Sequence, residues 1–399
     1  MYSYLNNYNK ILITFFLFFL IFGPAIPDII ATLFSILCLY FIFKDKIFNE
    51  NFFILILSFI LLLIPNFFSL YPSHSITEFI VNIRYFLFAY FISKYLKVDF
   101  EFIIKVLLII TLMLSFDLVF QYIFTFNLLG FPLDQSHNGS RASSFFRDEL
   151  VAGSYIFKFG LPVIGYFLYK KKFILSFLIT LFFEIAIICT GERMSFLLFS
   201  LGILILILFV LKDIKKILIV IFSGIIIFLS LYNISDRVKF RVNTFTSLFL
   251  TDSTENFRND GHVAHIWTAY EIFKKNPYFG TGHKTFRFEC SNEDIQFLVK
   301  SNSNGCSTHP HNSYFEILSD FGLFGFLSFL FFVLILLKKY KRNILYNSKL
   351  CGFYASFITI IWPISTSGNF FNNRIALMNF FIIGVLLCYS KKNILKKFF

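Results

Sequence analysis

Apolar residues form long unbroken runs along most of the chain, and polar residues gather between them. Several runs reach about 20 residues, enough for a helix to cross the hydrocarbon core of a bilayer. Only helices and closed barrels satisfy their backbone there, and no run shows the alternation of apolar and polar residues that barrel strands need. The pattern predicts an all-α, polytopic membrane protein built as a helical bundle.

Short clusters of Lys and Arg follow every second apolar run and predict the orientation of the helices. The alternate connections, such as 23–28 and 71–77, carry no Lys or Arg. Because basic residues accumulate in cytoplasmic loops, both termini are expected in the cytoplasm. These loops account for the net charge of +13, so we expect no nucleic-acid partner. Twelve spans fit the alternation, at 9–23, 27–43, 52–70, 78–96, 102–126, 150–169, 173–190, 194–211, 216–234, 313–337, 350–366 and 374–390.

One connection, residues 235–312, is much longer than the others and is expected on the periplasmic side. Its apolar positions recur every three or four residues, as in an amphipathic helix on the bundle or bilayer surface: Val263, Ile266, Trp267, Tyr270 and Phe273. Loops this long are usually functional or disordered, and the aromatic content argues against disorder. The sequence predicts a small periplasmic loop domain between nine spans in 1–234 and three in 313–399.

Two of the six cysteines, Cys290 and Cys306, fall within this loop domain. Thiols in an oxidising periplasm can form a disulfide. A metal site made of these cysteines with His309 and His311 is the alternative, but no C-x-x-C or H-x-x-x-H element supports it. We predict a structural disulfide and no metal.

Arginines stand at the ends of predicted spans, on the side expected to face the periplasm. Charged residues there are costly and are therefore functional candidates. Arg141 and Arg147 precede the span at 150–169, and Arg193 opens the span at 194–211. Snorkelling to lipid phosphates is the alternative role for Arg193.

Several polar residues lie inside predicted spans. Arg84 interrupts the span at 78–96, and Asp117 and Gln121 lie one helical turn apart in the span at 102–126. Asp117 and Gln121 either hydrogen-bond each other across the bundle or contact a substrate.

The segment CSTHPHNSYFEILSDFGLFG places polar residues directly before an apolar run. Pro310 biases its predecessor away from helix, so His311 is expected on an extended segment that leads into the tenth span. Asn312 or Ser313 can cap that helix. His309 is expected to be structural and His311 functional.

Arginine and histidine in this arrangement suit one kind of chemistry. A guanidinium binds phosphate through two hydrogen bonds, and imidazole exchanges a proton near pH 7. Neighbouring arginines are expected to lower the pKa of His311 and keep it neutral. The sequence has no D-x-D pair or carboxylate cluster for a divalent metal. We therefore expect a lipid-linked phosphate or pyrophosphate substrate, handled without metal or cofactor.

The same segment resembles the signature of the O-antigen ligase and polymerase superfamily of bacterial membrane glycosyltransferases. That signature is His followed by Asn, Ser or Gln, nine residues, and Gly-x-x-Gly. Here His311 and Asn312, then SYFEILSDF, then Gly322 to Gly325 take these places. The two glycines are also spaced to let a neighbouring helix approach closely. The preceding NPYFGTGHKTFR is similar to the family's Pro-x-x-Gly-x-Gly segment, and the resemblance covers about 140–390.

The resemblance implies transfer of a glycan from undecaprenyl pyrophosphate to an acceptor hydroxyl on the periplasmic face of the inner membrane. By position, His311 matches the family's general base and Arg193 its first arginine. The second arginine normally precedes a Trp-x-x-Ala element, here Trp267-Thr-Ala-Tyr and shifted by one, but histidines stand in its place. The residues that can replace it are His262, Arg258 and Arg287, and Arg141 and Asn312 complete the candidate substrate contacts.

Three functions are compatible with this pattern. A ligase joins the glycan to lipid A core or another acceptor, and a polymerase of the same superfamily uses the same donor to join lipid-linked repeat units. The third is a flippase or other transporter of lipid-linked oligosaccharide. Transporters usually place charges at mid-membrane on broken helices, whereas these charges gather at the outer mouth. We predict a ligase-type enzyme, with the polymerase as the alternative.

Overall fold

The computed structural model describes residues 2–389, apart from 47, 97, 134–140, 148, most of 211–260, 300–304, 347 and 366–367. Within this part every regular element is helical, and Phe126 and Pro132 form an isolated bridge. The all-α prediction is therefore confirmed. The predicted span at 216–234 lies largely outside the described residues.

Seven helical stretches in the described part are long and apolar enough to cross a membrane. This number supports a multi-pass membrane protein. The stretches are α2 (Ala25–Asp45), α3 (Glu50–Phe67), α4 with α5 (Pro72–Ile80 and Ile83–Lys94), α6 (Phe100–Phe124), α8 (Phe173–Thr190), α9 (Arg193–Val210) and most of α16 (Ser313–Tyr346).

Four other predicted spans coincide with helices that fall outside this group of seven. They are α1 (Tyr2–Phe19), α7 (Ala152–Tyr169), α17 (Cys351–Ile360) and α18 (Asn373–Tyr389). The helix α17 ends well before the predicted boundary at 366. Trp362 precedes Pro363, and a residue before proline is biased away from helical backbone, so the chain leaves the helix there.

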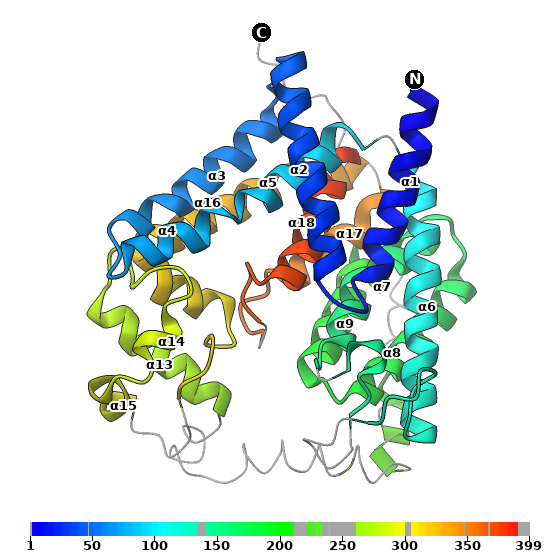
Figure 1. Ribbon diagram of the computed structural model, residues 1–399. Helices are drawn as coiled ribbons and strands as arrows, with labels where there is room; N and C mark the ends of the chain where they lie inside the picture. The colour runs from blue at the N-terminus through cyan, green and yellow to red at the C-terminus, as the bar shows by residue number, and fades with distance from the viewer. Residues whose placement is uncertain are drawn as a thin grey trace.

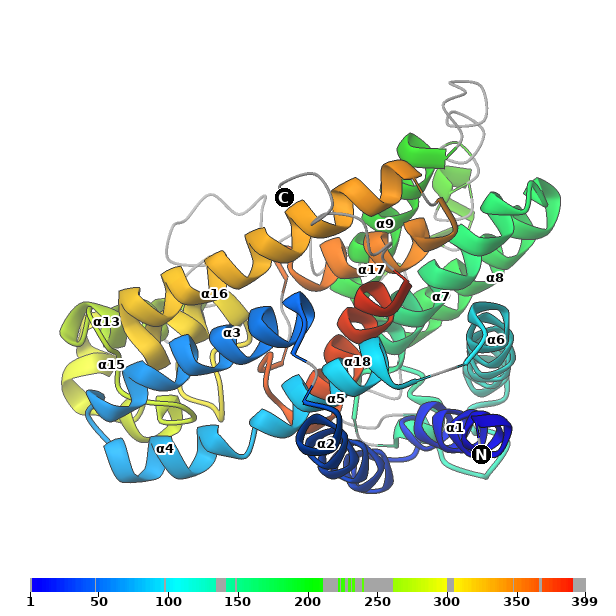
Figure 2. The ribbon, with the colours of Figure 1, turned by 90° about the horizontal axis from the view of Figure 1, so that it is seen from above.

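The helices form one bundle around a core rich in phenylalanine. α18 packs against both α5 and α17, and α7 packs against α8, α9 and α17 (Figures 1 and 2). Aromatic rings meet between helices: Phe86 on α5 lies 4.7 Å from Phe380 on α18, and Phe34 on α2 lies 4.6 Å from Phe91 on α5, measured between ring centroids. Such pairs add to the stabilisation that burial of the rings provides.

Two arginines in the bundle are held by carboxylates. Arg84 donates from Nε to Asp28 Oδ1 at 2.9 Å and from Nη2 to Oδ2 at 3.3 Å. Arg374, at the start of α18, donates to Glu149 Oε2 at 2.6 Å. A paired guanidinium and carboxylate offset the cost of placing either charge in an apolar bundle. The role of Arg84 is therefore structural.

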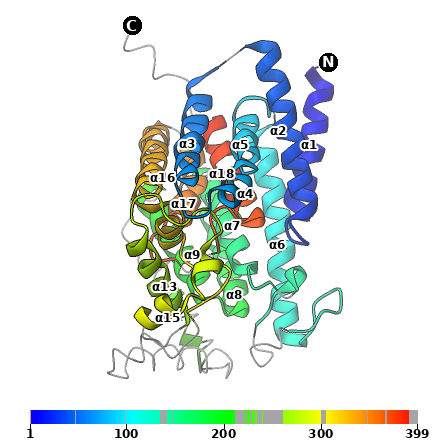
Figure 3. The same ribbon diagram turned by 60° about the vertical axis from the view of Figure 1, so that its left-hand side comes forward.

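Three short helices lie together at one end of the bundle, beside α16 (Figures 1 and 3). They are α13 (Gly261–Lys275), α14 (Phe286–Glu289) and α15 (Glu293–Val299). α13 covers the predicted amphipathic helix and packs against α16. The three helices share a small hydrophobic cluster separate from the main core, formed by Ala269, Ile272, Phe286, Cys290, Ile295 and Val299.

The helix α16 is interrupted at Gly322, where φ is 64° and ψ is −165°. Backbone of this kind is open almost only to glycine. The interruption frees backbone groups that pair with the segment between α13 and α14: Leu323 N donates to Pro277 O at 2.8 Å, and Gly282 N donates to Asp320 O at 2.8 Å. The close neighbour at Gly322 is therefore an inserted loop and not the helix that its spacing predicted.

Candidate active site

His311 lies among three other histidines. Its ring centroid is 4.3 Å from that of His309, 5.1 Å from that of His265 and 5.3 Å from that of His262. We call these four residues the histidine cluster. His262 and His265 come from the beginning of α13, and His309 and His311 come from the segment leading into α16. His265 was missing from the predicted site, although its spacing of three residues from His262 places both on one helix face.

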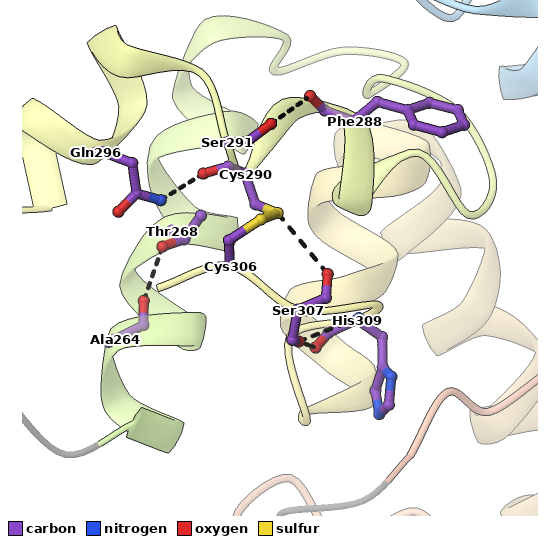
Figure 4. The surroundings of a disulfide bond; sticks show 9 residues. All are labelled: Ala264, Thr268, Phe288, Cys290, Ser291, Gln296, Cys306, Ser307 and His309. Atoms are coloured by element: carbon purple, nitrogen blue, oxygen red, sulfur yellow. Dashed lines mark hydrogen bonds between the residues drawn. A yellow bond between two sulfur atoms is a disulfide. The ribbon is translucent and has the colours of Figure 1, made fainter. Parts of the chain in front are cut away.

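The packing of α13 on α16 builds the cluster. α13 buries Ala264 and Thr268, whose hydroxyl donates to the Ala264 carbonyl at 2.9 Å (Figure 4). The same helix leaves His262 exposed. His311 has a φ of 56°, so the extended backbone predicted for it is wrong. This left-handed conformation is uncommon for residues other than glycine, and it turns the chain directly before α16.

A disulfide joins Cys290, after α14, to Cys306, with 4.9 Å between their Cα atoms. It therefore links α14 to the segment that carries the cluster (Figure 4). Ser307 follows Cys306, and its hydroxyl donates to the His309 carbonyl at 2.5 Å and accepts from His309 N at 3.3 Å. Thr308 Oγ1 lies 2.9 Å from His309 Nδ1. The bridge and these hydrogen bonds fix the backbone just before His311.

Replacing Cys290 and Cys306 together by serine is expected to destabilise the loop domain by about 3 kcal/mol, because the bridge closes a loop of about 15 residues. Turnover should fall with it, since His309 and His311 lose their anchor. Thiol labelling of the unfolded wild-type protein tests the bridge: the four free cysteines should label without reductant, and all six only with it. Six labelled thiols without reductant would contradict the bridge.

Burial and mutual repulsion keep the inner histidines neutral. The pKa of His311 is lowered to about 3, first by burial and then by His309, His262 and His265. The pKa of His309 is lowered to about 4, first by burial, then by His265 and by Arg287. Arginines were expected to have this effect on His311, but its neighbouring histidines have it instead. A proton on one ring raises the energy of a proton on the next.

Asn312 caps α16 and ties it to the loop after α17. Its Oδ1 accepts from Tyr314 N at 3.0 Å and Phe315 N at 3.2 Å. Its Nδ2 donates to the carbonyls of Pro363 at 2.9 Å and Ser365 at 3.3 Å. Both ends of the side chain are therefore engaged in fixing the start of the helix that follows His311.

Arg141 and Arg193 lie at the turn between α8 and α9. Arg141 Nε donates to the Thr190 carbonyl at 3.0 Å, and the exposed Arg193 begins α9. Between them, Glu192 Oε1 accepts from Gly153 N, in the first turn of α7, at 2.9 Å. Burial raises the pKa of Glu192. The turn thus carries Arg193 and binds Arg141 from a neighbouring loop, beside the first turn of α7.

Asp117 and Gln121 do not bond each other, and they fold the loop that carries Arg141. Asp117 Oδ1 accepts from Leu128 N at 2.8 Å. Gln121 donates to the Pro132 carbonyl at 2.9 Å and accepts from Ser143 N at 2.9 Å. Both side chains are buried. These bonds position the loop, and the predicted hydrogen bond between the two side chains is wrong.

The arginine turn and the histidine cluster lie at the same end of the bundle, on different sides. The loop from Pro363 to Arg374 links them, because Asn312 bonds its beginning and Glu149, just before α7, bonds its end. α13 and α14 lie on one side, and α8 and α9 on the other (Figures 1 and 2).

Of the remaining candidate arginines, one lies near the histidine cluster. Arg287 is exposed on α14, close enough for its charge to lower the pKa of His309. Arg258 lies outside the described residues. Arg147 stacks on the ring of Phe131, with 4.5 Å from its guanidinium carbon to the centroid. In the part of the chain that the structure describes, no group of three or more His, Cys, Asp or Glu side chains is arranged to hold a metal ion.

This arrangement defines a polytopic helical membrane protein with a histidine and arginine site at one end of its bundle. The family model described as O-antigen ligase matches residues 175–330, a stretch that contains both Arg193 and His311. The predicted resemblance to the O-antigen ligase and polymerase superfamily is therefore confirmed over these residues, and the match suggests a glycosyltransferase-like enzyme. No curated protein matches the chain.

Proposed function

We propose that this protein transfers a glycan from undecaprenyl pyrophosphate to an acceptor hydroxyl, on lipid A core or on another glycan, as an O-antigen ligase. The observation that carries the proposal is the position of His311. It occupies the histidine of the family signature, directly before α16, and three other histidine rings surround it within 5.3 Å.

His311 acts as the general base. An alcohol is a weak nucleophile unless its proton leaves as its oxygen attacks, and a positioned base contributes about 100- to 10,000-fold to the rate. Burial keeps the ring neutral, with a pKa lowered to about 3. A neutral imidazole has a lone pair available for the acceptor proton. The capped start of α16 and the disulfide hold that ring in place.

Arginines stabilise the leaving pyrophosphate. Arg193, on the turn between α8 and α9, and Arg141, on the loop that bonds this turn, supply two guanidinium groups at the end of the bundle where the histidine cluster lies. Each can form paired hydrogen bonds to phosphate oxygens, which strengthen as negative charge develops. Arg287 is the described candidate for the missing second family arginine, and Arg258 is the other. The reaction needs no metal or cofactor in this proposal.

We place this site on the periplasmic face of the inner membrane, together with the loop domain at 235–312. The orientation of α7 supports this placement. Its first turn bonds the arginine turn through Glu192, and its far end runs into the basic residues Lys170 to Lys172. Basic connections favour the cytoplasm, so the site lies on the opposite face.

The lipid-linked glycan that accumulates after deletion of the gene tests the function. We expect full-length polymer to remain on undecaprenyl pyrophosphate, and restoration of the gene should clear it. A polymerase would instead leave single repeat units on the carrier. Repeat units trapped on the cytoplasmic face would identify a flippase. An unchanged pool of carrier-linked glycan would contradict all glycan-transfer roles.

A further inference from the structure

The histidine cluster holds more proton acceptors than one base requires. The four rings differ in their access to water: His262 is exposed, whereas His265, His309 and His311 are partly covered. His262 and His311 meet edge to face, with an interplanar angle of 83° and 5.3 Å between centroids. One exposed ring thus lies against the ring that would take the proton from the acceptor.

A proton on His311 must leave before the next turnover. Burial opposes the charged ring, and neighbouring rings add repulsion. Because the charged form of His311 is disfavoured, a better solvated group beside it is a favourable next position for the proton. His309 is a poor exit, since its own pKa is lowered to about 4 and its Nε2 is buried without a hydrogen-bond partner. The solvated ring is His262.

We propose that His262 carries the acceptor proton from His311 to solvent, so that the cluster is a proton relay. This inference rests on the proposed function. As the acceptor oxygen bonds to the anomeric carbon, the bond from that carbon to the pyrophosphate oxygen breaks, and the electron pair leaves with the pyrophosphate. The hydroxyl proton passes to His311. It then crosses to His262, through one hydrogen bond or one intervening water, and reaches bulk water, so His311 is neutral again.

The charged and titratable groups around His311 agree with this direction of transfer. α13 presents His262 and His265 to it, and the segment before α16 presents His309. The charge of the exposed Arg287 on α14 also lowers the pKa of His309. A positive charge near His309 disfavours transfer of the proton to that ring and leaves transfer to His262.

The test uses purified wild-type protein and His262→Gln, with lipid-linked glycan isolated from the deletion strain and membranes of that strain as acceptor. Glutamine keeps polarity and size but cannot relay a proton. At low buffer concentration, His262→Gln should turn over about tenfold more slowly, a fraction of the full general-base contribution of about 100- to 10,000-fold. Added imidazole should restore its rate and leave the wild type unchanged. His74→Gln is the control, because His74 packs on Phe288, outside the cluster.

The possible outcomes distinguish a failure of the proton relay from a failure of the proposed glycan transfer. A His262→Gln variant as fast as the wild type at low buffer overturns the relay. A slow variant that imidazole does not rescue also overturns it, since that pattern indicates a structural role. His265→Gln, measured in parallel, should lose less, because His265 is more covered than His262. If His311→Ala itself transfers glycan normally, the proposed function fails, whatever His262 does.

Discussion

His311→Ala is expected to abolish glycan transfer, with a loss of about 100- to 10,000-fold in turnover. Alanine removes the only group that the proposed mechanism uses to take the acceptor proton, and the cluster offers no substitute at the same position. His309→Ala should be milder, since His309 packs on the reacting ring from 4.3 Å without contacting the acceptor. Transfer is measured on detergent-purified protein, as release of undecaprenyl pyrophosphate.

The control for this experiment is His74→Ala, in the short helix α4, which should retain wild-type turnover. All variants should insert into membranes in equal amounts and unfold at similar temperatures, because His311 belongs to neither hydrophobic cluster. Turnover of His311→Ala within a few-fold of the wild type would contradict the base assignment. Loss of the protein from the membrane would assign His311 a structural role.

Gly322→Ala is expected to destabilise the fold by roughly 2 to 6 kcal/mol, combining backbone strain with overpacking. An added Cβ would lie 2.5 Å from Phe279 N, and the backbone at φ 64° and ψ −165° is closed to alanine. The inserted loop would be displaced from the break in α16. Thermal unfolding in detergent measures the loss.

Gly261→Ala is the matched control for this substitution. Gly261 begins α13, and an added Cβ there would meet open space, so alanine should leave the unfolding temperature unchanged or raise it. Equal unfolding temperatures for Gly322→Ala and the wild type would show that α16 is not interrupted in the way described here.

The helices were predictable from sequence because the bilayer determines both the length of the apolar runs and the side on which basic loops lie. The boundaries of α8 and α9 agree closely with the predicted spans at 173–190 and 194–211. The break at Gly322 was not predictable. The spacing of Gly322 and Gly325 is compatible with a tight helix contact, and only the tertiary pairing of Leu323 with Pro277 shows that a loop takes the place of a helix.

The residue types of the candidate site were predictable from sequence. Which of these side chains the fold brings together was less predictable. His311 could be found from the signature, and Asn312 as a helix cap from its side-chain chemistry. The role of His265 depends on α13 folding back onto α16, a contact between segments more than 40 residues apart in the chain. The source of the lowered pKa of His311 also depends on that contact, since its neighbours are histidines and not arginines.

Reconstitution of the purified protein tests the central proposal, glycan transfer from a lipid-linked pyrophosphate donor, most directly. Vesicles would contain carrier-linked glycan from the deletion strain and its acceptor membranes, with a chelator present throughout. The predicted result is transfer of glycan to the acceptor with one undecaprenyl pyrophosphate released for each glycan moved. Glycan that crosses the bilayer while still attached to its carrier, or transfer that stops when the chelator is added, would contradict the proposal.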